Sequence, residues 1–414
     1  MQGSAESYDA LWESLLPVGR DPATCGYHRF AYSAAELACR EWFIAAAGQR
    51  DLEVETDRNG NLWAWWTGPW GGAAEGDALV VGSHLDSVRD GGAFDGPLGV
   101  ISAFAAIDLL RVRGHVPRRP VAVAAFAEEE GARFGVACAG SRLATGALDP
   151  DRASGLRDES GTTLAEAMSA AGFDPSRLGR DDERVTRIGA FVELHVEQGR
   201  GLVDIGAPVG LASGIWPHGR YRFTFSGAAN HAGTTLMEDR RDPVQAWSRT
   251  AVAAATAARA REARATFGRL EVHPNSTNAI PSHVRGWLDA RAADEQALQR
   301  LLDDVRGAAE DYAQQTGTSV DVATESFSPA VVFDVPLRER IAAALETSGS
   351  GPTPVLATAA GHDAGVLSAA GVPTAMLFVR NPTGVSHSPA EYAERGDCLA
   401  GVAALTRTLE ALAC

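Results

Sequence analysis

The chain lacks the excess of basic side chains that a nucleic-acid-binding or membrane-surface protein requires. Its 414 residues include 37 Lys and Arg against 53 Asp and Glu, which gives a formal net charge of -16. So acidic a surface argues against nucleic acid and anionic membranes as partners. A small anionic substrate is still compatible, because a few arginines can dominate the potential of one pocket.

Signals for secretion and membrane insertion are also missing. The five cysteines are odd in number and form no Cys-x-x-Cys, which favours reduced thiols in a cytoplasmic protein over a disulfide framework. The first 20 residues carry acidic side chains where a signal peptide is basic. No stretch approaches 18 apolar residues without charge, so we expect no membrane span.

Three common catalytic signatures are absent as well. There is no Gly-x-Ser-x-Gly, which argues against a serine hydrolase of the α/β-hydrolase type. Neither a Walker sequence nor a Gly-x-Gly-x-x-Gly is present, which argues against a nucleotide-binding enzyme.

Continuous apolar runs alternate with helical segments in the first half of the chain. Strands are predicted at Asp77–His84, Val121–Ala127 and Phe191–Val196, with helices at 35–47 and Leu98–Arg113. Strands that are apolar throughout indicate a mixed, mostly parallel sheet covered on both faces.

The pattern changes after about residue 212. Strands at Tyr221–Ser226, 269–273, 284–291 and 319–324, with helices from Asp242-Pro243 and from 294 to 315, give the order β-α-β-β-α-β of a ferredoxin-like domain. The α/β alternation then resumes, with helices at 336–347, 361–370 and 391–412 and a strand at 373–379. We therefore predict an α/β catalytic domain formed by residues 1–212 and 328–414, interrupted by a ferredoxin-like domain at 213–327.

Acidic and histidine side chains gather where the predicted strands end. His84 ends the first strand, Asp95 lies in the Gly-rich loop that follows, and Glu128-Glu129-Glu130 ends the second strand. With His195 and His387 they supply the carboxylate and imidazole ligands of a two-metal hydrolytic site. Asp95 has two oxygens and can bridge two ions. Asp86 is too near His84 to be an obvious separate ligand, so we expect it to accept the second ring N–H of His84.

Each of these residues also has an ordinary structural interpretation. A single histidine at a strand end is more often structural, and an acidic triplet is usually a solvated surface run. Spacing alone does not assign roles within Glu128-Glu129-Glu130, because a turn at the strand end relaxes the alternation of side chains. Their joint occurrence at strand ends, where α/β folds place their sites, favours the catalytic interpretation.

Ordered sequence motifs cover nearly the whole chain. They are Gly60-Asn61, GSHLDSVRDGGAFDGPLGV from Gly82, EEEGARFG from Glu128, GSRLATG from Gly140, ELHVEQG from Glu193, ANHAGTTLMEDRRD from Ala229, NAIP from Asn278, GHDAG from Gly361 and GVSHSPAE from Gly384. In these motifs the chain resembles the hydantoinase/carbamoylase family of di-metal amidohydrolases, within the aminoacylase-like metallopeptidase superfamily. That family contains N-carbamoyl-L-amino acid hydrolases, allantoate amidohydrolases and β-ureidopropionases.

The resemblance implies roles for the residues that match the family's motifs. One ion would be held by His84, Asp95 and His195, and the other by Asp95, Glu130 and His387. Glu129 would be the general base, while Glu128 would contact ligands rather than an ion. The ligand chemistry suits two Zn or Mn ions per subunit, with Co as a further possibility.

The resemblance also implies substrate contacts and a dimer. His231 would reach the active site of a partner subunit, making a homodimer necessary, and the inserted domain would act as lid and dimerisation domain. Asn278 and Arg291 would bind a substrate carboxylate, and Gln198 the ureido end. Gly361 and His362 would line the pocket. Without the resemblance, we would interpret His231 as a residue of a surface turn and Arg291 as part of a surface ion pair.

The implied reaction is hydrolysis of the ureido C–N bond of an N-carbamoyl-L-amino acid or allantoate, releasing ammonia and carbon dioxide. An N-formyl or N-acyl amino acid deacylase and a non-catalytic small-ligand-binding relative are the alternatives. The chain departs from the family at Trp216-Pro217-His218, Leu236 and Arg380-Asn381-Pro382. These departures leave the expected ligands intact and the choice of substrate open.

Overall fold

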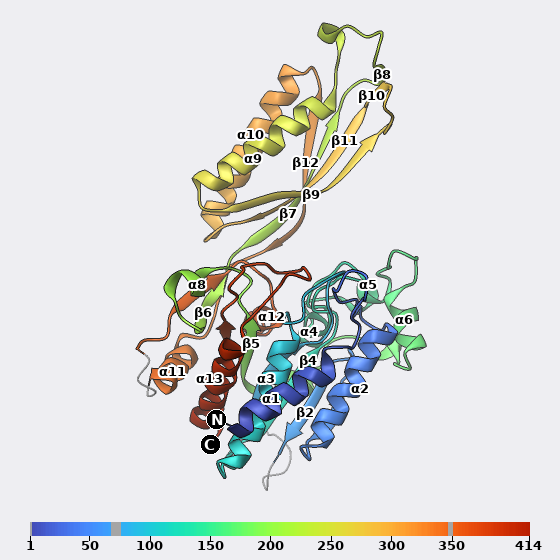
Figure 1. Cartoon of the computed structure of the whole chain (residues 1–414). Coiled ribbons are helices and arrows are strands. Elements are labelled where there is room, and N and C mark those ends of the chain that lie inside the picture. The colour runs from blue at the N-terminus through green and yellow to red at the C-terminus, as the bar shows by residue number, and fades with distance from the viewer. Residues whose placement is uncertain (1, 68–75, 347–350) are drawn as a thin grey trace. The chain divides into compact units, whose positions relative to one another are not determined.

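The chain folds into two compact units, seen in the computed structural model of Figure 1, which describes residues 2–67, 76–346 and 351–414. Unit 1 comprises Met1–Gly214 and Val332–Cys414, and unit 2 comprises Ile215–Val331. The insertion was expected at 213–327, so each of its boundaries lies a few residues later than expected.

Unit 1 is built on a nine-stranded mixed sheet. Its central strands run parallel, because β3 pairs in parallel with both β4 and β5, and β5 with β15. Antiparallel pairing of β1 with β2, β2 with β4 and β15 with β6 extends the sheet outward. This confirms the expected fold class. The strand order is β1 (Glu53–Thr56), β2 (Leu62–Trp66), β4 (Val121–Phe126), β3 (Ala78–His84), β5 (Ile188–Val196), β15 (Thr374–Val379), β6 (Val209–Ile215) and β13 (Val331–Val332), with β14 (Val355–Thr358) pairing with β6.

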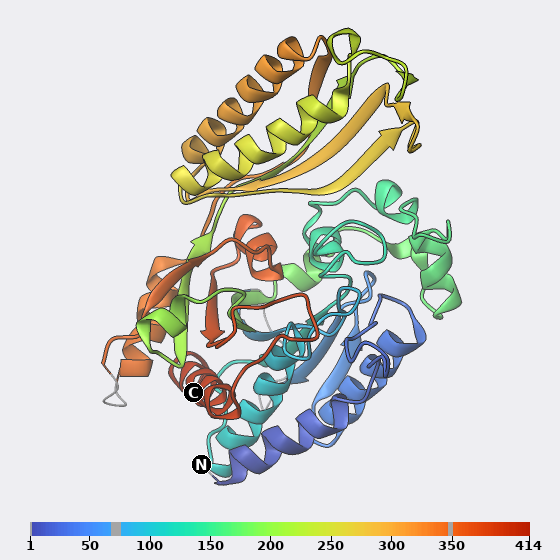
Figure 2. The ribbon, with the colours of Figure 1, turned by 45° about the horizontal axis from the view of Figure 1, so that its top comes forward.

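Helices cover both faces of this sheet, which explains why its central strands are apolar throughout. Val192 and Leu194 of β5 point into the main hydrophobic core, while Glu193 between them faces α12 and accepts the backbone N–H of Ala364 at 3.1 Å. The core side is formed by α1 (Gln2–Leu15), α2 (Ala34–Gly48), α3 (Pro97–Val112), α11 (Val335–Glu346) and α13 (Arg395–Ala413). Figures 1 and 2 show α13, in red, beside α3, in cyan.

The other side of unit 1 carries shorter helices. Helix α12 (Asp363–Ala369) packs on β5, β15 and α4 (Ala139–Thr145). The remaining short helices lie in the connections between strands and are α5 (Pro150–Ser154), α6 (Leu164–Ala170), α7 (Asp182–Val185) and α8 (Gly201–Ile205).

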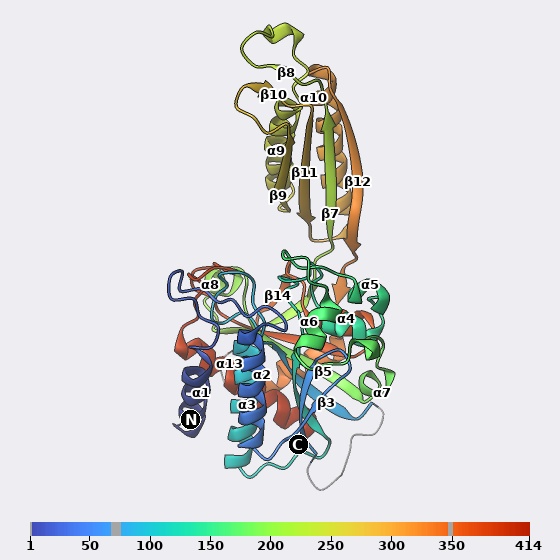
Figure 3. The ribbon, with the colours of Figure 1, turned by 90° about the vertical axis from the view of Figure 1, so that its right-hand side faces the viewer.

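Unit 2 has the expected order β-α-β-β-α-β. Its antiparallel sheet runs β12 (Ser319–Ser328), β7 (His218–Ser226), β11 (His283–Arg291), β9 (Arg264–His273), as Figure 3 shows from right to left. Phe223 and Leu288 are among the buried residues that pack against α9 (Pro243–Ala260) and α10 (Glu295–Gln315). A separate two-stranded pair joins β8 (Asn230–His231) to β10 (Ala279–Ile280).

Several predicted boundaries were wrong by three to five residues, among them the starts of the last helix and of strand β9. The last helix begins at Arg395 rather than 391, because the Glu391 side chain bonds to a distant loop and residues before 395 remain in the turn that carries it. Strand β9 begins at Arg264 rather than 269, because it pairs with β11 along its whole length. The predicted end of one helix, Thr347, lies outside the described residues. None of the helices in the described ranges combines the length and the hydrophobicity that a membrane span requires.

Candidate metal centre

The expected ligands lie at the carboxyl ends of the central parallel strands of unit 1. His84 is the last residue of β3, His195 is the next-to-last residue of β5, and the triplet Glu128-Glu129-Glu130 follows β4. Asp95 comes from the loop before α3, and His387 from the loop between β15 and α13. Side chains from strand ends of a parallel sheet meet at one edge, which is where α/β proteins place their sites.

Two groups of potential ligands share Asp95. In the first, Asp95 Oδ1 lies 3.1 Å from His195 Nε2 and 3.4 Å from His84 Nε2. In the second, His387 Nε2 lies 3.4 Å from Asp95 Oδ2 and 3.3 Å from Glu130 Oε2. Within each group the ligand atoms all lie within 4.8 Å of one another. The structure thus brings together all five residues that the sequence suggested as metal ligands.

The histidine rings are oriented for metal binding through Nε2. Nδ1 of His84 lies 3.1 Å from the carbonyl oxygen of Asp86, and Nδ1 of His195 lies 2.8 Å from the carbonyl oxygen of Val196. A carbonyl can only accept, so each Nδ1 carries the proton and each Nε2 presents a lone pair. Among the described residues, both Nε2 atoms are buried without a hydrogen-bond partner. These donors fit divalent ions such as Zn or Mn, which bind mixed imidazole and carboxylate ligands.

Asp95 and His387 each have a property that is common at functional sites. Burial disfavours the charged form of Asp95, but His195 and the other two histidines hold its pKa well below the usual range. His387 adopts the left-handed conformation, with φ of 55°. A histidine there is uncommon and costs conformational energy, which is typical of functional positions.

Asp86 has a wider role than the expected contact with His84. His84 Nδ1 lies 3.5 Å from the Asp86 carboxylate but only 3.1 Å from the Asp86 backbone carbonyl oxygen. The carboxylate instead accepts two backbone N–H groups. Oδ1 accepts from Glu129 at 3.2 Å and Oδ2 from Glu130 at 3.1 Å. Asp86 therefore ties the end of β3 to the turn after β4.

The structure separates the three glutamates that spacing could not. Glu128 points away from the metal groups, and its Oε1 accepts from the backbone of Arg133 at 3.1 Å and of Phe134 at 2.8 Å. Burial, reinforced by Asp86, raises the pKa of Glu128 to about 8. Glu130 belongs to the second metal group, and burial together with Asp95 raises its pKa to about 7.

Glu129 lies beside the metal groups without belonging to either. Its Oε2 is 3.7 Å from His84 Nε2, and the thiol of Cys138 donates to its Oε1 at 3.5 Å. Burial raises the pKa of Glu129 well above its ordinary value, although the nearby His84 opposes that shift. A carboxyl group with a raised pKa next to metal ligands is suited to exchange protons.

Two further expected residues border this centre. Gln198 Nε2 donates to Asp95 Oδ2 at 2.8 Å and to Ser386 Oγ at 3.1 Å. The His362 ring is buried, with its centroid 4.6 Å from that of His195, and burial holds its pKa well below the usual value. Gly361 immediately precedes His362 and is exposed.

Three expected residues belong to unit 2 and fall at two places. His231 and Asn278 are exposed and lie together, since His231 pairs with Ala279 and Ala232 donates to the carbonyl of Asn278 at 3.0 Å. Arg291 ends β11, where its Nε donates to Asp289 at 2.7 Å. Asn278 precedes β11 by five residues and Arg291 ends it, so the two places lie toward opposite ends of a strand that is about 26 Å long.

The departures from the family pattern have clear structural positions. His218 stands opposite Arg291 across the β7–β11 pairing. Arg380 forms a bidentate ion pair with Asp397 of α13, at 2.8 and 3.0 Å, and Asn381 accepts the backbone N–H of Thr383 within its own turn. The Arg380 turn is thus held by its own contacts and by α13. Leu236 is exposed.

Sequence reasoning assigned no role to three buried acidic residues at this centre. Glu193 accepts from Ser83 Oγ at 2.8 Å, Asp363 accepts from Ser141 Oγ, and Glu391 accepts from the loop that carries Asp95. Burial raises the pKa of each, that of Glu391 to about 7. All three lie inside the quoted motifs, but nothing in their spacing indicated a function.

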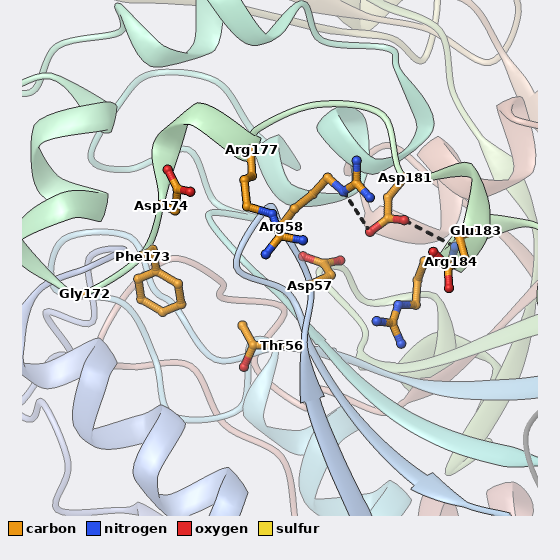
Figure 4. A pocket seen from close by; sticks show the side chains of 10 residues that line it. All are labelled: Thr56, Asp57, Arg58, Gly172, Phe173, Asp174, Arg177, Asp181, Glu183 and Arg184. Carbon is orange, nitrogen blue, oxygen red and sulfur yellow. Dashed lines mark hydrogen bonds and ion pairs between the residues drawn. The ribbon is translucent and has the colours of Figure 1, made fainter.

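Unit 1 also contains a cavity of about 380 Å³ that does not include these ligands (Figure 4). Arg58 crosses it to an ion pair with Asp181, at 3.4 Å. Its described lining shares no residue with either metal group, so we assign it no part in the reaction. The lining consists of Thr56, Asp57, Arg58, Gly172, Phe173, Asp174, Arg177, Asp181, Glu183 and Arg184.

Comparison with known proteins gives one consistent family. Over 412 residues, 98% of both chains, the sequence is 36% identical to N-carbamoyl-L-amino acid amidohydrolase of Geobacillus stearothermophilus. It is 34% identical to allantoate amidohydrolase of Escherichia coli K12 over 96% of both chains. The crystal structure of a hydantoinase/carbamoylase family amidase from Burkholderia vietnamiensis matches with a TM-score of 0.84 and 28% identity, over 99% of this chain and 97% of that one.

These relatives confirm the resemblance drawn from the sequence motifs. The model of peptidase family M20/M25/M40 matches residues 80–411, which include every expected metal ligand. The chain therefore belongs to peptidase family M20/M25/M40.

Proposed function

We propose that the protein is a metal-dependent amidohydrolase that cleaves the ureido C–N bond of a small carboxylate, an N-carbamoyl-L-amino acid or allantoate, releasing ammonia and carbon dioxide. The observation that carries the proposal is the placement of Asp95 between two ligand groups, with the buried carboxyl of Glu129 beside them. Relatives that match nearly the whole chain are named for these two reactions.

The two ligand groups would hold two divalent ions, Zn or Mn, with Co also compatible. Bound ions supply Lewis acidity and lower the pKa of water at the site. His84 and His195 would bind through Nε2, His387 through its exposed ring and Glu130 through its carboxylate. Asp95 would be shared by both ions, because its Oδ1 lies near His84 and His195 while its Oδ2 lies near His387.

Glu129 would move the proton. It belongs to neither ligand group, so its carboxylate stays available to take a proton from the attacking water and to deliver it to the leaving nitrogen. Asp86 would fix its position through the backbone N–H of Glu129. Gln198, which reaches Asp95 through its amide, would orient the ureido end of the substrate.

Arg291 would bind the substrate carboxylate. Its guanidinium already holds a carboxylate, that of Asp289, through Nε at 2.7 Å and an Nη at 3.1 Å. Bidentate pairing of this kind matches the geometry of a substrate carboxylate. His218, opposite Arg291, would influence which carboxylates fit.

His231 and Asn278 would come from the partner subunit of a homodimer. Within one unit 2 they lie toward the opposite end of β11 from Arg291, and that strand, about 26 Å long, is too long for all three to touch one small substrate. In a dimer, each protomer would instead supply His231 and Asn278 to the site of its partner. There His231 would stabilise the developing oxyanion, and Asn278 would help Arg291 to bind the substrate carboxylate. Unit 2 would then serve as both lid and dimerisation domain.

We also propose a cytoplasmic location. All five cysteines, each within the described part of the chain, are free thiols, and Cys39, Cys138 and Cys398 are buried. Reduced thiols are typical of the cytoplasm.

Ammonia release across a substrate panel tests the function. Protein loaded with Mn²⁺, and separately with Zn²⁺, would be assayed with allantoate, N-carbamoyl-L-amino acids of several sizes, N-carbamoyl-β-alanine and N-formyl-L-amino acids. Turnover confined to ureido or carbamoyl compounds supports the proposal. Preference for N-formyl compounds, or no turnover with two ions bound per subunit, contradicts it.

A further inference from the structure

Glu391 lies beside the metal ligands but belongs to neither group. We propose that Glu391 is a positioning residue that holds the bridging carboxylate of Asp95 in place for two ions. The inference rests on the proposed two-metal function and adds a residue to it.

Glu391 fixes the backbone on which Asp95 stands. Its Oε2 accepts the N–H of Phe94 and that of Asp95, both at 3.0 Å, although these residues are almost 300 positions away in sequence. The loop that carries Asp95 belongs to no helix or strand, so its amides depend on such a partner. The Glu391 side chain is buried, which strengthens hydrogen bonds to its carboxylate.

Gly92 makes room for this contact. A Cβ atom at position 92 would lie 2.2 Å from Oε2 of Glu391 and 2.5 Å from its Cβ. Only a residue without a side chain allows the loop to approach the carboxylate so closely. The Gly-rich character of the loop is therefore explained in part by Glu391.

Glu391 also competes with Asp95 for one hydroxyl proton. Ser386 Oγ lies 3.1 Å from Glu391 Oε1 and 3.1 Å from Asp95 Oδ2. A serine has a single O–H, so it donates to one of these oxygens at a time. When Glu391 accepts it, a lone pair of Asp95 Oδ2 is left for an ion in the group with Glu130 and His387.

Two variants separate these contributions. Glu391→Ala removes both the amide contacts and the acceptor for Ser386. Glu391→Gln keeps an oxygen for the two amides but turns an NH2 group toward Ser386, whose proton is then left to Asp95. Glu394→Ala is the matched control, because Glu394 is exposed, lies three residues away and makes no side-chain cap contact at the start of α13.

Binding of Mn²⁺ to the full chain, stripped of metal by a chelator, is the measurement. The electron paramagnetic resonance signal of a coupled Mn²⁺ pair, followed during titration, reports two ions at one bridge. For Glu391→Ala we expect the paired signal to need about 10- to 100-fold more Mn²⁺ than in the wild type. Glu391→Gln should show a smaller shift in the same direction, and because it keeps an acceptor for both amides, its metal-free form should unfold at the wild-type temperature.

The outcomes distinguish this inference from the proposed function. If the wild type and Glu394→Ala form the Mn²⁺ pair and the folded Glu391 variants form it at the same concentration, the positioning role is wrong and the two-metal function stands. A wild type that never forms the pair overturns both. If Glu391→Ala lowers the unfolding temperature of the metal-free chain and Glu391→Gln binds as the wild type does, Glu391 only stabilises the fold.

Discussion

Asp86 accepts the backbone N–H of Glu129 at 3.2 Å, and so joins the end of β3 to the turn after β4. The two residues are 43 positions apart, and Asp86 is 3% exposed. A buried carboxylate that accepts backbone N–H groups makes strong, charge-assisted hydrogen bonds. The position of the proposed base therefore depends on a residue that belongs to neither ligand group.

Replacing Asp86 by Asn should weaken both metal binding and turnover. The asparagine side chain has one acceptor oxygen and one NH2 group, whereas the carboxylate has two acceptor oxygens. The backbone N–H of either Glu129 or Glu130 would therefore face the NH2 group and lose its acceptor. We expect Mn²⁺ affinity and kcat/KM each to fall about 10- to 100-fold. Asp204→Asn, an exposed change on α8, is the control. Wild-type values of both quantities in Asp86→Asn would refute the role.

Glu129→Gln should retain two ions yet lose nearly all turnover. Glutamine has a similar shape and Glu129 is in neither ligand group, so ion binding should persist while proton transfer is lost. We expect kcat to fall by about 10²- to 10⁴-fold, measured together with metal content by mass spectrometry. Glu130→Gln is the comparison and should lose metal. Normal turnover in Glu129→Gln would show that another group is the base.

The sequence predicted the central strands of the unit 1 sheet better than β9, the edge strand of the unit 2 sheet. Strands buried on both faces, such as β3 and β4, are continuous apolar runs and were recognised as strands. The first five residues of β9 alternate between exposed and half-buried side chains, but the run is short and contains no fully buried residue, and its strand conformation depends on pairing with β11. Tertiary pairing of this kind is not visible in a local pattern.

The residues that could bind metal ions were predictable from the sequence, but the contacts that hold them in place were not. His84, Asp95 and the glutamate triplet stood out because they follow strand ends. Glu391 did not, because its partners Phe94 and Asp95 are distant in sequence and it was predicted to be the first residue of the last helix. Only the folded chain shows that the carboxylate turns back to the loop.

The pKa of Glu128 predicts how the stability of the metal-free protein varies with pH. Burial raises this pKa to about 8 from 4.5, so between these values the folded state binds the proton more tightly than the unfolded state. Stability relative to Glu128→Gln, which does not titrate, should therefore be greatest at low pH and fall as pH rises toward 8. The loss from pH 5.5 to 8 should be about 2 to 3 kcal/mol.

Urea unfolding of the wild type and Glu128→Gln at several pH values measures this difference. Both proteins must be free of metal, because bound ions would add their own pH dependence. A difference that stays constant, or grows in favour of the wild type as pH rises, would show that Glu128 is ionised in the fold.

Arg291→Ala should act mainly on substrate binding. Loss of a charge-assisted, bidentate contact should raise KM about 10- to 100-fold, with a smaller change in kcat. Arg285→Ala is the matched control, because Arg285 lies on the same strand and the same face of the sheet, three pleats away along β11. The measurement is steady-state kinetics with the best substrate of the panel and with an analogue in which an amide replaces the carboxylate. An unchanged KM for the carboxylate substrate would contradict the assignment of Arg291.

Complementation between two inactive variants tests whether His231 acts across subunits. His231→Ala keeps Glu129, and Glu129→Gln keeps His231, so neither homodimer has a complete site under the proposal. In a mixed dimer, the protomer that keeps Glu129 would receive His231 from its partner. Random mixing should therefore restore roughly a quarter of the wild-type activity, one complete site in half of the dimers. If His231 instead acts within its own subunit, mixed dimers verified by distinct affinity tags remain inactive. The same mixture made with His283→Ala in place of His231→Ala is the positive control, since His283 is exposed on β11 and is given no part in the reaction, so its dimers should stay active.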